Sequence, residues 1–142
     1  MNTYNFDDLE FQNTDTYNEF INDNPSNAFL NIRASSANVA VPISNVNIIV
    51  SKDINDNKII FFNGFTDDSG MINRISLPTP KLASNDLEIP KGIVYDIYAK
   101  YDPDNYERNY KVLMYPGICV VQNINIVPTN MVFNEMDDNN GS

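Results

Sequence analysis

The chain has no histidine and no tryptophan, and Cys119 is its only cysteine. Without histidine there is no Ser-His or Cys-His nucleophile pair, no histidine-ligated zinc and no imidazole general base. A single cysteine excludes an intrachain disulfide and a cysteine-based metal cluster. The alternating pattern around Cys119 predicts that its side chain is a small apolar group in or beside the core.

Long apolar runs and clusters of basic residues are also missing. No stretch approaches the roughly 20 apolar residues of a membrane-spanning helix, and the acidic, polar start of the chain is unlike a secretory signal. We therefore expect no membrane insertion and no signal peptide, which leaves a cytoplasmic or a spore- or envelope-associated location open. The net charge of −10 disfavours nucleic-acid binding, because phosphate contacts need clustered Lys and Arg.

The negative charge lies at the two ends of the chain. Residues 1–27 contain six acidic residues and no Lys or Arg, and the last eight residues add three acids. The stretch between them, 28–134, holds ten acids and all nine bases. The sequence predicts an acidic arm over 1–27, one folded domain over 28–134 and an acidic tail over 135–142. These ends keep a strand-rich domain soluble or contact a basic partner.

Hydrophobic periodicity predicts one short helix followed by strands. Tyr17, Phe20 and Ile21 share one face of a helix over 15–23, which Asn24 and Pro25 end. The period then changes to two in seven stretches that turn-forming residues separate. These stretches are 28–34, 43–52, 58–65, 71–77, 93–101, 106–114 and 117–127. The pattern predicts an all-β fold, a seven-stranded Greek-key β-sandwich with a short N-terminal helix.

The alternation also predicts which side chains form the core. Most of the predicted strands are apolar on one face, and these faces would pack together inside the sandwich. The stretch 58–65 differs, because it is apolar on both faces. The side chains expected in the core are Leu30, Ile32, Val46, Ile48, Val50, Tyr95, Ile97, Val120, Ile124 and Ile126.

The stretch GFTDDSG, residues 64–70, looks most like a chemical site. It predicts a structural turn in which Thr66 ends a strand, Asp67 accepts hydrogen bonds from backbone amides and Gly70 takes a positive φ. Catalysis by Asp67 with Asp68 is disfavoured, because neighbouring side chains of an extended chain point to opposite sides. A calcium site is the alternative, and it would need about six to eight oxygen ligands from several loops. The candidate calcium ligands are Asp53, Asp56, Asp67, Asp102 and Asp104.

Four short motifs follow one another along the chain. They are VPISNVNIIV (41–50), GFTDDSG (64–70), ISLP (75–78) and VYDIYAKYD (94–102). Their order resembles that of carboxypeptidase-regulatory-like domains, which are relatives of the collagen-adhesin B-type and transthyretin-like sandwiches. With LPTP (77–80) and YPGICVVQNINIVP (115–128), the chain is most similar to the sandwich region of clostridial spore cortex-lytic and related peptidoglycan enzymes. The resemblance covers about residues 28–128 and implies the same sandwich.

Two departures from these families bear on activity. Transthyretin-like hydroxyisourate hydrolases rely on histidines, which this chain lacks. Many collagen-adhesin B-type domains join a first-strand Lys to a last-strand Asn, but the corresponding first-strand residue here is Arg33. Its guanidinium stays protonated and cannot attack an amide, so Asn123, Asn125 and Asn130 lack a nucleophile.

The sequence favours a non-catalytic structural or protein-interaction module of the bacterial cell envelope or spore, without a cofactor. The alternative is a calcium-dependent or small-ligand binder that uses the acidic loops, and a carboxylate hydrolase ranks third. We expect a protein partner or self-association through the sheet edges and an apolar N-terminal arm. The arm residues are Tyr4, Phe6, Leu9 and Phe11. They are too apolar for a purely solubilising tail, so the arm packs either on its own sandwich or on a partner.

Overall fold

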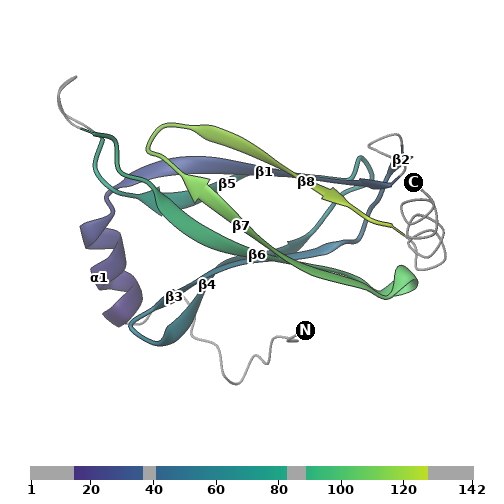
Figure 1. Ribbon diagram of the computed structural model, residues 1–142, viewed down its shortest axis with the longest axis horizontal. Coiled ribbons are helices and arrows are strands. Elements are labelled where there is room, and N and C mark those ends of the chain that lie inside the picture. The colour runs from purple at the N-terminus through teal and green to yellow at the C-terminus, as the bar shows by residue number, and fades with distance from the viewer. Residues whose placement is uncertain (1–14, 37–40, 83–88, 128–142) are drawn as a thin grey trace, which may run out of the picture.

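The computed structural model describes residues 15–36, 41–82 and 89–127, which form one α-helix and eight strands in two sheets (Figure 1). The elements are α1 (Asp15–Asp23), β1 (Ser26–Ser36), β2 (Val41–Pro42), β3 (Asn47–Ile54), β4 (Asn57–Phe65), β5 (Met71–Thr79), β6 (Ile93–Tyr101), a 3₁₀ helix (Asp102–Asp104), β7 (Tyr106–Met114) and β8 (Cys119–Asn125). The predicted all-β sandwich with a short helix is confirmed. Strand β2 is additional, since two residues are too few for an alternation to show.

Each sheet has four strands. The first sheet is antiparallel throughout and has the order β4-β3-β6-β7. In the second sheet β1 is central, with β5 antiparallel on one side and β8 parallel on the other, and β2 pairs with the end of β1. The first long strand of the sandwich therefore lies beside its last described strand.

The strands place their connections at two opposite ends of the sandwich (Figure 1). Asn47 at the start of β3 pairs with Phe65 of β4 and Lys100 of β6. The β4–β5 connection (66–70) and the β6–β7 connection (102–105) therefore share one end, which we call the turn end. The β3–β4, β5–β6 and β7–β8 connections lie with α1 at the other end, which we call the groove end.

Side chains from both sheets fill the core much as the alternation predicts. Nine of the ten expected residues are buried, among them Tyr95 and Ile97 of β6. Val120 is only half-buried, because β8 pairs with β1 alone among the described strands. The prediction for Cys119 was wrong, since its side chain is exposed. The period of two that turns Val120 inward turns Cys119 outward.

Helix α1 covers one edge of the core through aromatic contacts. The ring centroids of Tyr17 and Phe20 lie 5.7 and 5.5 Å from that of Phe61 in β4. Phe61 in turn meets Tyr95 edge to face, with centroids 5.2 Å apart. The helix ends where Asn24 Nδ2 donates a hydrogen bond to the Phe20 carbonyl oxygen at 2.9 Å. A nine-residue helix is marginal by itself, so these contacts hold it in place.

Strand β4 is apolar on both faces, in agreement with the pattern of 58–65. Ile59 and Phe61 belong to the main core. Ile60 belongs instead to a second apolar cluster with Ile49 of β3 and Tyr98 of β6. Because successive side chains of a strand point to opposite sides, this second cluster lies on the outer face of the first sheet.

Candidate functional site

Thr66 closes the turn end with its hydroxyl group. The buried Oγ1 donates a hydrogen bond to the Ile43 carbonyl oxygen (2.8 Å) and accepts one from the Val46 amide (3.0 Å). The Thr66 amide also donates to the Val46 carbonyl oxygen at 3.0 Å. Thr66 therefore fixes the segment between β2 and β3 against the end of β4.

Asp67 and Gly70 shape the connection between β4 and β5. Asp67 Oδ1 accepts hydrogen bonds from the amides of Ser69 (2.9 Å) and Met71 (3.0 Å), as Asp side chains do in tight turns. Gly70 has a φ of 76°, and its carbonyl oxygen accepts a hydrogen bond from the Ala34 amide at 2.7 Å. A Cβ at position 70 would lie 2.3 Å from the Ala34 carbonyl oxygen. The carboxylate of Asp67 is thus engaged within the turn.

The five candidate calcium ligands are divided between the two ends. Asp67, Asp102 and Asp104 follow strands that finish at the turn end, whereas Asp53 and Asp56 belong to the β3–β4 hairpin at the groove end. Across residues 15–36, 41–82 and 89–127, no group of three or more His, Cys, Asp or Glu side chains is placed to hold a metal ion. The fold therefore separates acidic loops that a shared site would have to bring together.

A polar hollow of about 220 Å³ lies beside the β6–β7 connection. Its lining consists of Asp104, Asn105, Tyr106, Glu107, Arg108, Asn125 and Val127. Two carboxylates and one guanidinium therefore face a small polar space. The Glu107 carboxylate already accepts a hydrogen bond from the Tyr98 hydroxyl group. Asp104 is the one calcium candidate that lines this hollow.

Two tyrosines are held in their neutral form. Burial is the largest cause that raises the pKa of Tyr106. The hydrogen bond with Tyr110 (2.6 Å between the hydroxyl oxygens) raises it further. Burial is the largest cause that raises the pKa of Tyr95, and the neighbouring Tyr17 raises it further. The Tyr95 hydroxyl group donates a hydrogen bond to the Pro78 carbonyl oxygen at 2.6 Å. Both phenols stay protonated at neutral pH and hold structure by hydrogen bonding.

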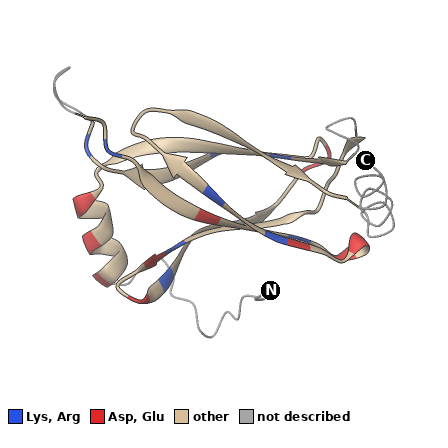
Figure 2. Ribbon diagram, viewed as in Figure 1, with Lys and Arg blue, Asp and Glu red and all other residues tan. Residues whose placement is uncertain are grey.

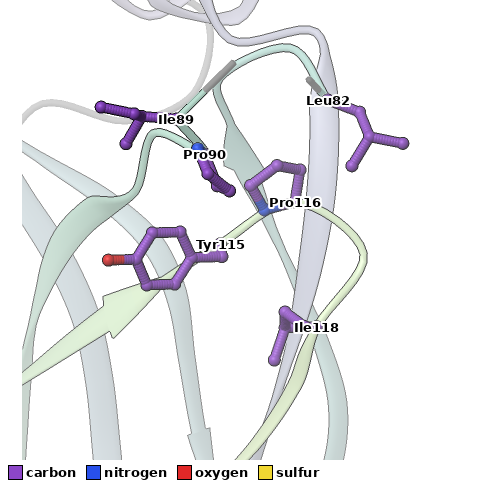
Figure 3. A pocket seen from close by; sticks show the side chains of 6 residues that line it. All are labelled: Leu82, Ile89, Pro90, Tyr115, Pro116 and Ile118. Carbon is purple, nitrogen blue, oxygen red and sulfur yellow. The ribbon is translucent and has the colours of Figure 1, made fainter. Parts of the chain in front are cut away.

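An apolar groove of about 450 Å³ opens at the groove end (Figure 3). Its lining comes from two connections that are far apart in the sequence, β5–β6 and β7–β8. The lining residues are Leu82, Ile89, Pro90, Tyr115, Pro116 and Ile118. The groove therefore exists only because the fold brings these two connections together.

Most of the groove's side chains are exposed although they are large and apolar. Ile89 is 85 % and Leu82 60 % exposed, and Tyr115 and Ile118 are also open to solvent. Soluble proteins seldom group such side chains in water unless the patch contacts another molecule. Exposed lysines, Lys81 and Lys91, adjoin Leu82 and Pro90 in the sequence. The groove is therefore an exposed apolar surface, and two positively charged residues adjoin its lining in the sequence.

Backbone geometry holds the wall of the groove in place. A Cβ at Gly92 would lie 2.8 Å from Leu113 Cδ1 and 2.9 Å from Tyr115 Cε1, so the missing side chain lets both residues pack closely. Gly117 has a φ of 79° in the turn that follows. The turn closes where the Ile118 amide donates to the Tyr115 carbonyl oxygen at 3.2 Å. The tyrosine is therefore presented by a defined turn.

Sequence reasoning did not identify the groove. Its residues fall in connections, where hydrophobic periodicity gives no signal. The available signal was compositional: Leu82 and Ile89 lie in a link with three prolines, between strands that were otherwise joined by polar turns. Apolar residues in such a link are worth testing as a contact surface.

Charges on the described strands are mixed and form no single-sign face (Figure 2). Helix α1 carries Asp15, Glu19 and Asp23 without a basic residue. On the second sheet, Arg33 stands opposite Asn123 in the parallel register of β1 and β8, and both are exposed. Because a guanidinium does not attack an amide, this pair forms no cross-link.

The predicted interaction arm, with Tyr4, Phe6, Leu9 and Phe11, lies outside the described residues. So do Asn130, the predicted domain end at 134 and the acidic tail over 135–142. The part of the acidic N-terminal segment that the structure describes is α1 and the start of β1.

Comparison with known proteins identifies no relative: no family model matches the chain, and neither does any curated protein. In the part of the chain that is described, no helix is both long and apolar enough to cross a membrane. The groove and the other surfaces of the sandwich are therefore the features that bear on function.

Proposed function

We propose that this protein is a non-catalytic protein-interaction or structural module that binds an apolar segment of a partner protein in the groove. The observation that carries the proposal is the group of exposed Leu82, Ile89, Tyr115 and Ile118 around one opening of about 450 Å³. Binding would remove this apolar surface from water, which is the main source of affinity in such contacts.

The shape and charge of the groove suggest the chemistry of the partner. Tyr115 supplies a large ring with few rotatable bonds, a side chain that is enriched at the centres of protein interfaces. Lys81 and Lys91 favour a segment whose apolar residues are flanked by acidic ones. Edge strands β4, β5, β7 and β8 offer further contact surfaces by strand addition.

The family assignment belongs to the same proposal. We infer a carboxypeptidase-regulatory-like sandwich with transthyretin-like Greek-key connections, working at the bacterial cell envelope or spore. Two features support it: the order of the four sequence motifs, and the pairing of the first long strand with the last described one. The lack of histidine supports a non-catalytic role, since it removes the commonest general base.

A capture experiment with matched variants tests the groove. The full chain, Ile118→Asp and Val121→Asp are immobilised as baits for extracts of the source cells. Ile118 and Val121 are similarly exposed, at 49 % and 54 %, but only Ile118 lines the groove. We expect wild type and Val121→Asp to retain the same protein and Ile118→Asp to retain at least about tenfold less, a loss near 1.4 kcal/mol. Equal capture by all three baits would refute the groove as the binding surface.

The polar hollow supports one alternative function, calcium-dependent or small-ligand binding. Asp104 and Glu107 supply carboxylate oxygens there, fewer than the about six to eight ligands that calcium takes. Addition of calcium would raise the melting temperature if a native site bound the ion. A calcium-dependent increase that Asp104→Asn abolishes would favour this alternative over the groove.

A further inference from the structure

Four of the long strands, β4, β5, β7 and β8, lie at sheet edges, and three of them carry features that weaken pairing with another chain. Strand β7 is charged at Glu107, Arg108 and Lys111. Strand β5 contains Pro78, and its pairing with β1 shifts register in the segment that holds Arg74. Strand β4 shifts its register against β3. Proteins use such charges, prolines and bulges to keep sheet edges from joining.

The fourth edge strand, β8, carries none of these features. Its sequence CVVQNIN contains no charged residue, no proline and no glycine. Its register with β1 runs without a shift over the whole strand. Among the described strands only β1 pairs with β8, so the other side of β8 is a regular and uncharged strand edge, which we call the β8 edge.

The hydrogen bonds to β1 show which backbone groups of β8 point away from it. The Ile118 carbonyl oxygen accepts a hydrogen bond from the Phe29 amide at 2.9 Å. The Ile126 amide donates to the Ser35 carbonyl oxygen at 2.8 Å. Because the direction of the backbone groups alternates along a strand, the even-numbered residues between these two bonds face β1. The odd-numbered residues, whose amides and carbonyls face the β8 edge, are Cys119, Val121, Asn123 and Asn125.

We propose that two copies of this chain pair along the β8 edge, antiparallel and about a two-fold axis at Gln122. This register places Val121 opposite Asn123 of the second copy, and Cys119 opposite Asn125 of the second copy. Each of these pairs exchanges amide-to-carbonyl hydrogen bonds, as facing residues of an antiparallel pair do. A symmetric register centred on another residue of β8 leaves part of the strand unpaired. The two-fold arrangement is closed, so it ends at a dimer.

The inner face of β8 is complementary to itself in this register, which favours a second copy as the occupant of the edge. Val120 comes to lie opposite Ile124 of the second copy, so that apolar side chains meet across the strands. Val120 is also the one expected core residue that stays half-buried in the single chain, because no described strand flanks it on this side. A second β8 supplies that strand and removes more of Val120 from water.

Pairing displaces one side-chain contact at this edge. Gln122 Nε2 donates a hydrogen bond to the Asn123 carbonyl oxygen at 3.0 Å, and this contact is exposed to solvent. In the dimer the Val121 amide of the second copy donates to that carbonyl oxygen instead. The Gln122 side chains of the two copies then face each other across the axis, where each amide can donate to the other.

The inference goes beyond the groove and does not depend on it. Strand β8 follows the β7–β8 connection, so it begins at the groove end and runs toward the turn end. Because the two β8 strands are antiparallel, the groove ends of the two copies lie at opposite ends of the joined sheet. The dimer therefore presents two grooves that point away from each other.

Proline at position 123 tests the pairing with the full chain in sedimentation velocity. The Asn123 amide points to the β8 edge, so Asn123→Pro removes a hydrogen bond to the second copy and none to β1. We expect wild type to form a dimer that dissociates on dilution, and Asn123→Pro to raise the dimer dissociation constant at least about tenfold. Asn123→Ala keeps the amide and should change that constant by less than about threefold. Circular dichroism checks that each variant is folded.

A disulfide at the two-fold axis tests the register without a proline. In a Cys119→Ser background, Gln122→Cys should give a disulfide-linked dimer under mild oxidation. The Cα atoms of such a non-hydrogen-bonded antiparallel pair lie about 4.5 Å apart, within the range of a disulfide. Asn123→Cys is the matched control. It lies opposite Val121 of the second copy, so the two new thiols are too far apart to join.

Three results would overturn the proposal. A wild-type chain that sediments as a monomer at every concentration would show that the β8 edge does not join a second copy. A dimer that Asn123→Pro leaves intact would place the interface on another surface. Cross-linking of Asn123→Cys as fast as that of Gln122→Cys would exclude the two-fold axis at Gln122.

Discussion

The turn end and the groove end of the sandwich are built from opposite chemistry. At the turn end, Thr66, Asp67 and Gly70 direct their polar groups at neighbouring backbone amides and carbonyls, within hydrogen-bond distance. At the groove end, large apolar side chains surround an opening and stay in contact with water. Polar groups that satisfy one another stabilise the fold, whereas exposed apolar groups contribute little until a partner covers them.

This difference separates the residues that look functional in the sequence from those of the proposed binding surface. The acidic turn draws attention in the sequence, yet its carboxylate serves the turn. The groove has no motif, yet it presents the apolar area that binding can remove from water. Substitutions at both ends test whether this chemical difference governs stability and binding.

Gly70→Ala should be the most damaging of these substitutions. Its Cβ would meet the Ala34 carbonyl oxygen at 2.3 Å, in a backbone conformation that already strains a side chain. We expect the free energy of unfolding to fall by about 3 kcal/mol or more, because the clash adds to a backbone strain of about 1–3 kcal/mol. Gly117→Ala is the matched control, because its φ is 79° and no atom lies within 4 Å of the added Cβ. If Gly70→Ala and Gly117→Ala lower the free energy of unfolding in urea equally, backbone strain alone explains both effects.

Thr66→Val should lower the free energy of unfolding by about 1–3 kcal/mol. The substitution leaves the Val46 amide and the Ile43 carbonyl oxygen without their hydrogen-bond partner. Thr79→Val is the counterpart near the groove end. Thr79 is fully buried, and its Oγ1 has no hydrogen-bond partner among the described residues. Removing that hydroxyl should be neutral or stabilising by up to about 1 kcal/mol. If Thr66→Val and Thr79→Val unfold at the same urea concentration, the hydrogen bonds of Thr66 do not make it more important for stability than Thr79.

Asp68→Ala should have the smallest effect, within about 0.5 kcal/mol, since its side chain is exposed at the tip of the turn. Calcium should leave the melting temperature of both wild type and Asp68→Ala unchanged. A calcium-dependent rise in wild type that the variant lacks would make the turn end a binding site and reverse the comparison.

The regular elements were predictable because their signals are local. Alternation in 93–101 and 106–114 matches β6 and β7 residue for residue, and the apolar face of 15–23 matches α1. The same rule, applied strictly, would have turned Cys119 outward together with Val121. The apolar outer residue Ile60 was visible in the sequence as a stretch with two apolar faces, but its companions Ile49 and Tyr98 join it only through strand pairing.

The groove could not be predicted from the sequence, for a different reason. Leu82 and Ile118 come from connections 36 positions apart in numbering, and each connection alone resembles an ordinary loop. Their meeting depends on the β5–β6 and β7–β8 links sharing one end of the sandwich, which is a property of the topology. The division of the acidic loops between the two ends follows from the same topology.

The stability of Ile118→Asp tests most directly whether the groove is kept for binding and not for folding. Its urea midpoint should equal that of wild type, corresponding to a change within about 0.5 kcal/mol, because the side chain is half exposed and completes no part of the core. A loss of about 2 kcal/mol or more, comparable to that of Thr66→Val, would show that the groove residues are part of the folded core and would contradict the account.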